Sequence, residues 1–191
     1  MASLSFIIFP LIGYISGSLP FSIWITRFAK GVDVRDGGSG HAGTTNTVRQ
    51  AGFGWGALVL VLDLAKGFLP VFLALTYSAE TWVVTFTGAL AVVGHCWPLF
   101  AQFRGGMGLA TFGGALAAVT WIAFFAGIGL LLAMLVIIRH RARASLITGM
   151  LLAPLCWILN LRGVEFWIAV AGGIVIAWRF FSDWNRQYRG L

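Results

Sequence analysis

The stretch Leu109–Ile138, LATFGGALAAVTWIAFFAGIGLLLAMLVII, contains thirty residues and no charge. One continuous helix of this length would be about 45 Å long, whereas the hydrocarbon core of a bilayer is about 30 Å thick. The number of times that this stretch crosses a membrane therefore decides the topology of the chain. We predict a short helix near Leu109–Ala118 and a full-length helix near Trp121–Ile138.

The overall composition is typical of a membrane protein. The chain has 191 residues, of which 59% are hydrophobic and only 10% are charged, and its mean hydropathy is +0.90. A soluble domain carries about 25% charged residues, so this chain has too few to cover a surface that faces water. Its length corresponds to one domain. We therefore predict a single all-α, membrane-embedded domain over residues 1–191.

We predict that five further apolar runs are membrane spans, and the first three of them have the length of about 20 residues that a membrane helix needs. They are Leu4–Ile25, Trp55–Tyr77, Trp82–Phe100, Leu146–Asn160 and Phe166–Ala177. In the first run the basic residues Arg27 and Lys30 follow the apolar stretch. A cleavable signal peptide has its charges before the apolar stretch, so we expect this run to be a retained span. Together with the two helices in Leu109–Ile138, the runs predict seven transmembrane helices, one of them short.

The distribution of basic residues predicts the orientation. With seven crossings, eleven of the thirteen Lys and Arg residues lie on one side, including Arg189; Arg162 lies on the other, and Lys66 falls within a span. Because basic loops stay in the cytoplasm, we predict an amino terminus outside and a carboxyl terminus in the cytoplasm. A net charge of +7 also suits nucleic-acid binding. Here the basic residues sit in short loops between apolar runs, so we expect no nucleic-acid partner.

Two glycine-rich segments lie on the predicted inner side, and each precedes a span. They are Gly37–Arg49, the first segment, and Gly94–Thr111, the second segment. Glycine-rich backbone and helix N-termini bind phosphate, and the arginines Arg49 and Arg104 add forked donors. The two segments thus predict a site for an anion with more than one phosphate-like group. Tight turns and close helix packing explain the glycines equally well.

An ionisable pair, Asp63 and Lys66, lies within a predicted span, three residues apart and so on one helix face. Charges in the bilayer are costly and usually face the protein interior. We interpret them as a mutually neutralising structural pair; a place in a substrate pocket is the alternative. The two cysteines, Cys96 and Cys156, lack the spacing of a metal site. We expect no metal and no cofactor.

Six groups of residues stand in the order and spacing of a known family. They are Gly17–Ser22, Gly31–Arg35, Gly38–Gly40, Thr45–Asn46 with Arg49, Leu62–Gly67 with Pro70, and Gly94–Thr111. With them the chain resembles the integral-membrane acyl-phosphate:glycerol-3-phosphate acyltransferases (the PlsY family) over nearly its whole length. The resemblance implies transfer of a fatty acyl group from acyl phosphate to glycerol 3-phosphate. The product would be lysophosphatidic acid, made at the bacterial cytoplasmic (inner) membrane as the first step of phospholipid synthesis.

The resemblance also implies a set of site residues. Substrate and phosphate binding is expected from Ser39, Gly40, His41, Thr45, Asn46, Arg49, Arg104, Gly105, Gly106, Gly108 and Thr111. Acyl phosphate is already activated, so catalysis calls for positioning and electrostatic stabilisation rather than a covalent nucleophile. There is no His-x₄-Asp motif, and His95 is the candidate proton acceptor; a cap at a helix end is its other interpretation. The acyl tail is expected between helices, in contact with membrane lipids.

The chain departs from the family pattern at three places. Met107 stands where the family has a lysine, His41 follows Gly38–Gly40 where the family has an asparagine, and Phe180–Asp183 replaces a His-Arg-Glu-Asn run. Arg104 also stands where lysine is usual. All three departures fall in the polar site, so a non-catalytic or substrate-switched relative that binds phosphate-bearing lipid precursors stays open. A transporter would show internal repeats and a path of intramembrane charges, which the sequence lacks.

Overall fold

The structure, a computed structural model, describes residues 2–78 and 80–186. In these residues it contains nine α-helices, two short 3-10 helices and no strand, so the predicted all-α class is confirmed there. Arg189 lies outside the described residues. The α-helices are α1 (Ala2–Gly17), α2 (Phe21–Lys30), α3 (Thr44–Ala51), α4 (Phe53–Tyr77), α5 (Thr81–Cys96), α6 (Leu109–Val119), α7 (Trp121–Ile138), α8 (Arg141–Ile158) and α9 (Val164–Phe181).

The long apolar stretch is divided where the sequence predicts. Helix α6 ends at Val119, and α7 begins at Trp121. Thr120 between them has an extended backbone, with φ −157° and ψ 132°, and its side chain accepts a hydrogen bond from the amide of Ile122 at 3.2 Å. This hydroxyl satisfies one of the free amides at the start of α7. The division therefore has a local cause that the length argument alone did not identify.

Five segments of the described chain are long and apolar enough to cross a membrane, and α6 adds a shorter apolar helix. The five are Leu4–Lys30, Phe53–Tyr77, Thr81–Ala101, Trp121–Ile138 and Val164–Phe181. Helix α7 has the most exposed apolar surface of the five, because only 6% of its residues are buried within the protein. Large apolar side chains such as Leu132, Val136 and Ile137 face outward. A surface of this kind suits lipid rather than water.

The predicted first span, Leu4–Ile25, lies within an apolar segment long enough to cross a membrane, Leu4–Lys30, but this segment is not one continuous helix. Helix α1 ends at Gly17 and α2 begins at Phe21, with a break between them. Pro20 causes this break, because it has no amide hydrogen and disfavours a helical conformation at Leu19. The Lys66 ammonium donates to the freed carbonyl of Leu19 at 3.0 Å. The intramembrane lysine thus stabilises a helix end.

Two other boundaries differ from the prediction. The first segment is not a loop throughout, because α3 occupies its second half between Gly43 and Gly52. Its Thr-Thr-Asn-Thr start has no apolar periodicity, which is why the hydrophobic pattern gave no signal. Helix α8 begins at Arg141, five residues before the predicted start, with Nδ1 of His140 accepting from the amide of Arg143 at 3.4 Å.

Close helix pairs depend on small residues. A methyl group at Gly17 would overlap the carbonyl of Ala91 between α1 and α5, and one at Gly67 would overlap the carbonyl of Thr111 between α4 and α6. Small residues permit this approach of helix backbones in membrane bundles. As a result α6, although short, contacts α4, α5, α7 and α9.

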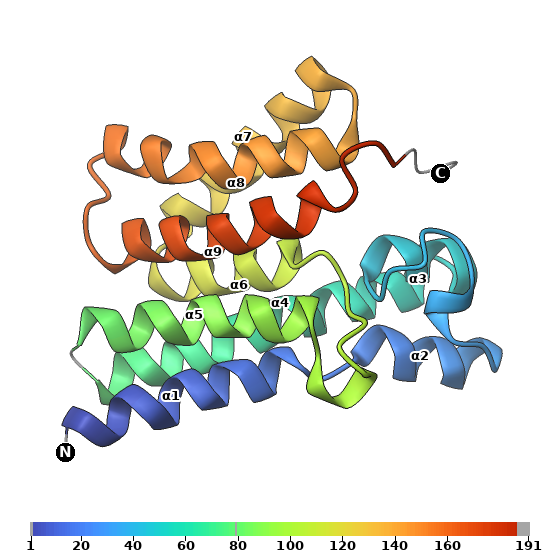
Figure 1. Ribbon diagram of the computed structural model, residues 1–191, viewed down its shortest axis with the longest axis horizontal. Coiled ribbons are helices and arrows are strands. Elements are labelled where there is room, and N and C mark those ends of the chain that lie inside the picture. The colour runs from blue at the N-terminus through green and yellow to red at the C-terminus, as the bar shows by residue number, and fades with distance from the viewer. Residues whose placement is uncertain (1, 79, 187–191) are drawn as a thin grey trace.

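One end of the bundle, on the right in Figure 1, gathers α2, α3, the end of α5, the α7–α8 junction and the end of α9. These segments and the loops beside them carry most of the basic residues outside the spans. The glycine-rich segments also meet here, since the amide of Ala42 donates to the carbonyl of Gly105 at 3.4 Å. The fold thus brings together two segments that are far apart in the sequence.

Candidate functional site

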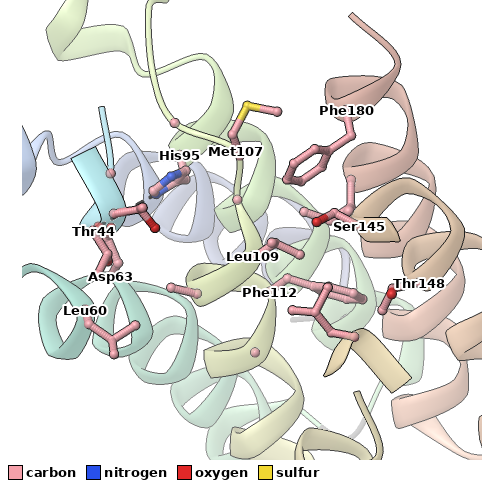
Figure 2. Close-up of a pocket in the computed structure, with 18 of the residues that line it drawn as sticks. Thr44, Leu60, Asp63, His95, Met107, Leu109, Phe112, Ser145, Thr148 and Phe180 are labelled. Atoms are coloured by element: carbon pink, nitrogen blue, oxygen red, sulfur yellow. Dashed lines mark ion pairs between the residues drawn. The ribbon is translucent and has the colours of Figure 1, made fainter. Parts of the chain in front are cut away.

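A cavity of about 630 Å³ lies among α3, α4, α6, α7, α8 and α9. Its size is typical of a small-molecule site. One side receives polar side chains from the first segment and from α4 and α5, as Figure 2 shows for Thr44, Asp63 and His95. The remainder is mostly apolar. Its apolar lining includes Leu60, Leu64, Leu109, Phe112, Leu116, Phe124, Ile128, Leu131, Leu135, Leu152, Ile176 and Phe180.

Arg49 is the most notable polar residue in the cavity wall. Its Nε and Nη2 atoms are buried and have no hydrogen-bond partner among the described residues, and the same holds for the hydroxyl of Thr44. Buried polar groups without partners are rare because they cost free energy. Two guanidinium donors and a hydroxyl that line the same cavity suit an anionic ligand with several acceptor oxygens. This end of the cavity therefore has the chemistry of a phosphate or carboxylate site.

Asn46 holds the loop in front of Arg49. Its side-chain amide donates to the carbonyls of Val34 (2.6 Å), Gly37 (3.1 Å) and His41 (3.0 Å), and its oxygen accepts from the amide of Ser39 at 3.1 Å. The side chain is 2% exposed and its hydrogen-bonding capacity is used within the protein. Asn46 therefore shapes the first segment.

The second segment takes its shape from close backbone packing. The amides of Gly105 and Gly106 donate to the carbonyls of Cys96 (3.2 Å) and His95 (3.1 Å). A methyl group at Gly106 would overlap both the carbonyl of Ala42 and the imidazole of His95. Gly108, with φ +85°, then turns the chain into α6. As a result both α3 and α6 begin at the cavity, and the positive ends of their dipoles favour an anion there.

A buried polar network adjoins this anion end. Lys66 Nζ lies 3.0 Å from Asp63 Oδ1, so the predicted pairing is observed. The pair is not isolated, because His95 Nδ1 lies 3.7 Å from the same oxygen and 3.1 Å from the hydroxyl of Thr111. Asp63 and His95 also line the cavity. The network thus holds the His95 ring in place through Nδ1.

A second polar cluster joins the first segment to the end of α9. His41 Nε2 lies 2.7 Å from Asp183 Oδ2, and Arg179 contacts both His41 Nδ1 (3.4 Å) and the carbonyl of Gly106 (2.9 Å). Burial lowers the pKa of His41 below its usual 6.5, although the Asp183 carboxylate opposes this shift. A neutral ring can donate to Asp183 through Nε2 and accept from Arg179 at Nδ1.

Asp33 and Arg35 connect the two segments outside the cavity. The Asp33 carboxylate accepts from the Arg35 amide (3.0 Å) and from its guanidinium (2.8 Å). The hydrogen bond from the Arg35 side chain lowers the pKa of Asp33 to about 2. Arg35 in turn donates to the carbonyl of Ala101 at 2.9 Å. The pair orients the start of the first segment against the turn around Ala101, which precedes the glycines of the second segment.

The structure brings together many, but not all, of the expected site residues. The cavity is lined by Ser39, His41, Thr45, Asn46, Arg49, Asp63, His95, Gly106 and Gly108. The expected residues outside its lining are Gly40, Lys66, Arg104, Gly105 and Thr111. Arg104 is exposed, and its carbonyl accepts from Arg35 at 3.5 Å. Of the two arginines expected to form matching half-sites, one lines the cavity.

The glycerol-3-phosphate acyltransferase family model matches residues 7–190. The chain is 38% identical over 184 residues to the glycerol-3-phosphate acyltransferase of Rubrobacter xylanophilus, covering 94% of this chain and 90% of the relative. It is 41% identical over 139 residues to glycerol-3-phosphate acyltransferase 2 of Thermotoga maritima, covering 73% and 69%. The chain belongs to the glycerol-3-phosphate acyltransferase family.

Solved structures of a family member have the same fold. The crystal structure of PlsY, an integral membrane glycerol 3-phosphate acyltransferase, in its glycerol 3-phosphate form has a TM-score of 0.84 and 32% identity, over 95% of this chain and 91% of that one. The lysophosphatidic acid form has a TM-score of 0.81 and 30% identity, with the same coverage. This chain therefore has the integral membrane fold of the family.

Two of the three positions where the resemblance implies a departure from the family pattern contact each other. His41 and Asp183 form the 2.7 Å contact described above, so these changes at distant sequence positions belong to one cluster. The third, Met107, lines the cavity and supplies no charge. Two parts of the cavity lining were not predicted from the sequence. One is Thr44, and the other is the set of polar residues on α8. The α8 residues could have been found from a polar stripe at i, i+4 and i+7 in an apolar helix, namely Arg141, Ser145 and Thr148.

Proposed function

We propose that this protein transfers a fatty acyl group from acyl phosphate to glycerol 3-phosphate and so forms lysophosphatidic acid. The observation that carries the proposal is that one cavity joins the unpartnered donors of Arg49 and Thr44 to a long apolar lining. The substrates have matching parts, because both carry phosphate and one carries a fatty chain. The names of the family relatives support the same reaction.

The reaction needs one bond exchange. A glycerol 3-phosphate hydroxyl oxygen attacks the acyl carbon, the new ester C–O bond forms, and the C–O bond to the phosphate breaks, releasing inorganic phosphate. The hydroxyl proton passes to Nε2 of His95. In the required tautomer Nδ1–H donates to the hydroxyl of Thr111 at 3.1 Å, with Asp63 Oδ1 3.7 Å from the same nitrogen, so Nε2 is free to accept the proton.

Positioning is the second requirement. Two phosphate groups repel each other, so holding both near the acyl carbon requires donors that are fixed in advance. Arg49, Thr44 and the amino-terminal ends of α3 and α6 provide donors at one end of the cavity. The fatty chain extends along the apolar lining between α6, α7 and α8.

We infer a topology of seven crossings in the bacterial inner membrane. The α1–α2 unit, α4, α5, the short α6, α7, α8 and α9 each cross once, with the amino terminus outside and the carboxyl terminus in the cytoplasm. The gathering of basic segments at the end with α2 and α3 (Figure 1) supports this orientation. The whole chain forms one domain around the cavity. Glycerol 3-phosphate then enters from the cytoplasm.

One observation favours a second function. Met107 lines the cavity without a charge, so a protein that binds phosphate-bearing lipid precursors without acyl transfer would keep the same groove. A direct assay separates the two functions. Protein purified in detergent is given palmitoyl phosphate and glycerol 3-phosphate, and phosphate release and lysophosphatidic acid are measured. Formation of both products supports acyl transfer, whereas binding of glycerol 3-phosphate by folded protein without turnover supports the second function.

A matched pair of variants on α7 tests the acyl groove. Gly127 lines the cavity, whereas Gly129 is exposed and an added Cβ there meets nothing within 4 Å. Gly127→Trp should lower kcat/KM for palmitoyl phosphate by about tenfold or more by filling the groove, with a smaller loss for a four-carbon acyl phosphate. Gly129→Trp should leave both values close to wild type. Equal rates for Gly127→Trp and wild type with the long chain would show that the chain binds elsewhere.

A further inference from the structure

The amino-terminal half of α8 carries a polar stripe that the reaction described above does not use. Arg141, Ser145 and Thr148 lie at i, i+4 and i+7, and all three line the cavity. Figure 2 shows Ser145 and Thr148 across the cavity from Thr44 and Asp63. Met107, Leu109 and Phe112 lie between the two sides. The cavity therefore has a second polar side, opposite the Arg49 end.

The Arg141 guanidinium is available to a ligand. Arg141 is exposed and lines the cavity, and no hydrogen bond or ion pair joins its side chain to another residue in the described part of the chain. Its neighbour Arg143 is engaged, because its side chain donates to the Trp184 carbonyl (3.3 Å) and to Asn185 Oδ1 (3.4 Å) and lies over the Trp184 ring. Arg179 is likewise held by Gly106 and His41. Among the arginines of the described chain, Arg49 and Arg141 line the cavity.

Ser145 gives independent evidence for a ligand on this side. It is 3% exposed and lines the cavity, yet its hydroxyl has no hydrogen-bond partner among the residues that the structure describes. A hydroxyl that lines a cavity without a protein partner can donate to, or accept from, a ligand there. Ser145 lies one helical turn beyond Arg141, so one ligand group can reach both side chains. The first turn of α8 adds the positive end of a helix dipole.

We propose that Arg141 and Ser145 form a second anion subsite, which binds the phosphoryl group of the acyl phosphate and provides the positive charge that Met107 lacks. The inference rests on the proposed function. Leu152 continues the cavity lining along the same helix, so a phosphoryl group held here has its fatty chain directed along the apolar wall. Glycerol 3-phosphate then takes the Arg49 end, where His95 faces its hydroxyl. The two phosphates bind on opposite sides of Met107.

The test separates the two substrates. Arg141→Gln should raise KM for palmitoyl phosphate by about tenfold, the loss expected for a charge-assisted hydrogen bond, and change KM for glycerol 3-phosphate by less than about twofold. Arg139→Gln removes a nearby exposed charge outside the cavity lining and should leave both constants unchanged. In Arg141→Gln, the added change Met107→Lys should restore most of the lost affinity. Equal changes in both KM values, or no rescue, would overturn the proposal.

A binding measurement keeps this test independent of turnover. A sixteen-carbon acyl phosphonate, which cannot transfer its acyl group by losing phosphate, is titrated into wild type and Arg141→Gln, with size-exclusion chromatography to confirm folding. Weaker binding by Arg141→Gln supports the subsite even where the wild type shows no turnover, and in that case only the proposed reaction fails. Binding equal to that of the wild type overturns the subsite, whatever the activity.

Discussion

The two glycine-rich segments look alike in sequence but hold their shape in different ways. The first segment, Gly37–Arg49, is held by side-chain hydrogen bonds, mainly those of Asn46, and ends in a helix that presents Thr44 and Arg49 to the cavity. The second segment, Gly94–Thr111, is held by backbone contacts that leave no room for a side chain at Gly106. One segment therefore supplies binding groups, and the other supplies a scaffold.

This difference shows why composition alone misjudges such segments. Each contains glycines and an arginine, which suggests two equivalent half-sites. In the structure Arg49 has unpartnered donors at the cavity, whereas Arg104 is exposed and outside the lining. Whether an arginine reaches the cavity depends on its local structure: Arg49 lies on helix α3, and Arg104 lies in an exposed turn. The distinction leads to predictions that separate scaffold from binding group.

The largest effect is expected from the scaffold. Gly106→Ala places a methyl group against the backbone carbonyl of Ala42 and the imidazole of His95, so both must shift. We expect loss of measurable acyl transfer and a destabilisation of about 2–4 kcal/mol. Gly54→Ala, where an added Cβ meets nothing within 4 Å, is the control and should keep wild-type rate and stability. A normal rate for Gly106→Ala would refute the close-packed scaffold.

A smaller effect is expected from the side-chain scaffold of the first segment. Asn46→Ala removes hydrogen bonds to Val34, His41 and Ser39, so the loop before Arg49 loses its shape. The rate should fall about tenfold, and unfolding free energy by about 2–3 kcal/mol. Asn46→Asp keeps the acceptor but removes the donors and should be at least as damaging. If Asn46→Asp retained the wild-type thermal midpoint, the carbonyl contacts would not be what holds the segment.

The smallest effect concerns the connection between the segments and depends on pH. Because the pKa of Asp33 is lowered from 3.8 to about 2, its ionised form contributes stability above pH 4 that is lost as the pH falls toward 2. Asp33→Asn should therefore lower the thermal midpoint by about 1–3 °C at pH 7, a small change for a partly exposed pair. The difference should shrink between pH 4 and pH 2. A difference that grew on acidification would contradict this role.

The sequence predicted the larger features well and the contact details poorly. Length and charge divided Leu109–Ile138 correctly, because bilayer thickness limits any apolar helix. The break at Pro20 had a local signal in the proline itself. The start of α3 had little signal, since threonines carry no apolar period. No sequence signal distinguished Arg49 from Arg104, because only tertiary packing determines which guanidinium reaches the cavity.

The site was likewise predictable in its parts but not in its arrangement. The glycine-rich segments and the Asp63–Lys66 pair were identified from residue type and spacing, and the individual glycines and His95 from the family resemblance. The contact between His41 and Asp183 joins positions 142 residues apart, and no local pattern connects them. The polar stripe of α8 was visible in the sequence, but its meaning depends on the cavity that it faces.

The ratio of kcat/KM between Arg49→Ala and Arg104→Ala tests the central claim most directly, that the first segment carries the phosphate-binding group. Both variants remove one arginine from one glycine-rich segment, and both are assayed with palmitoyl phosphate and glycerol 3-phosphate. We predict that Arg49→Ala loses about 100-fold or more, while Arg104→Ala stays within about threefold of the wild type. Equal losses in the two variants, or a wild-type value for Arg49→Ala, would contradict the account.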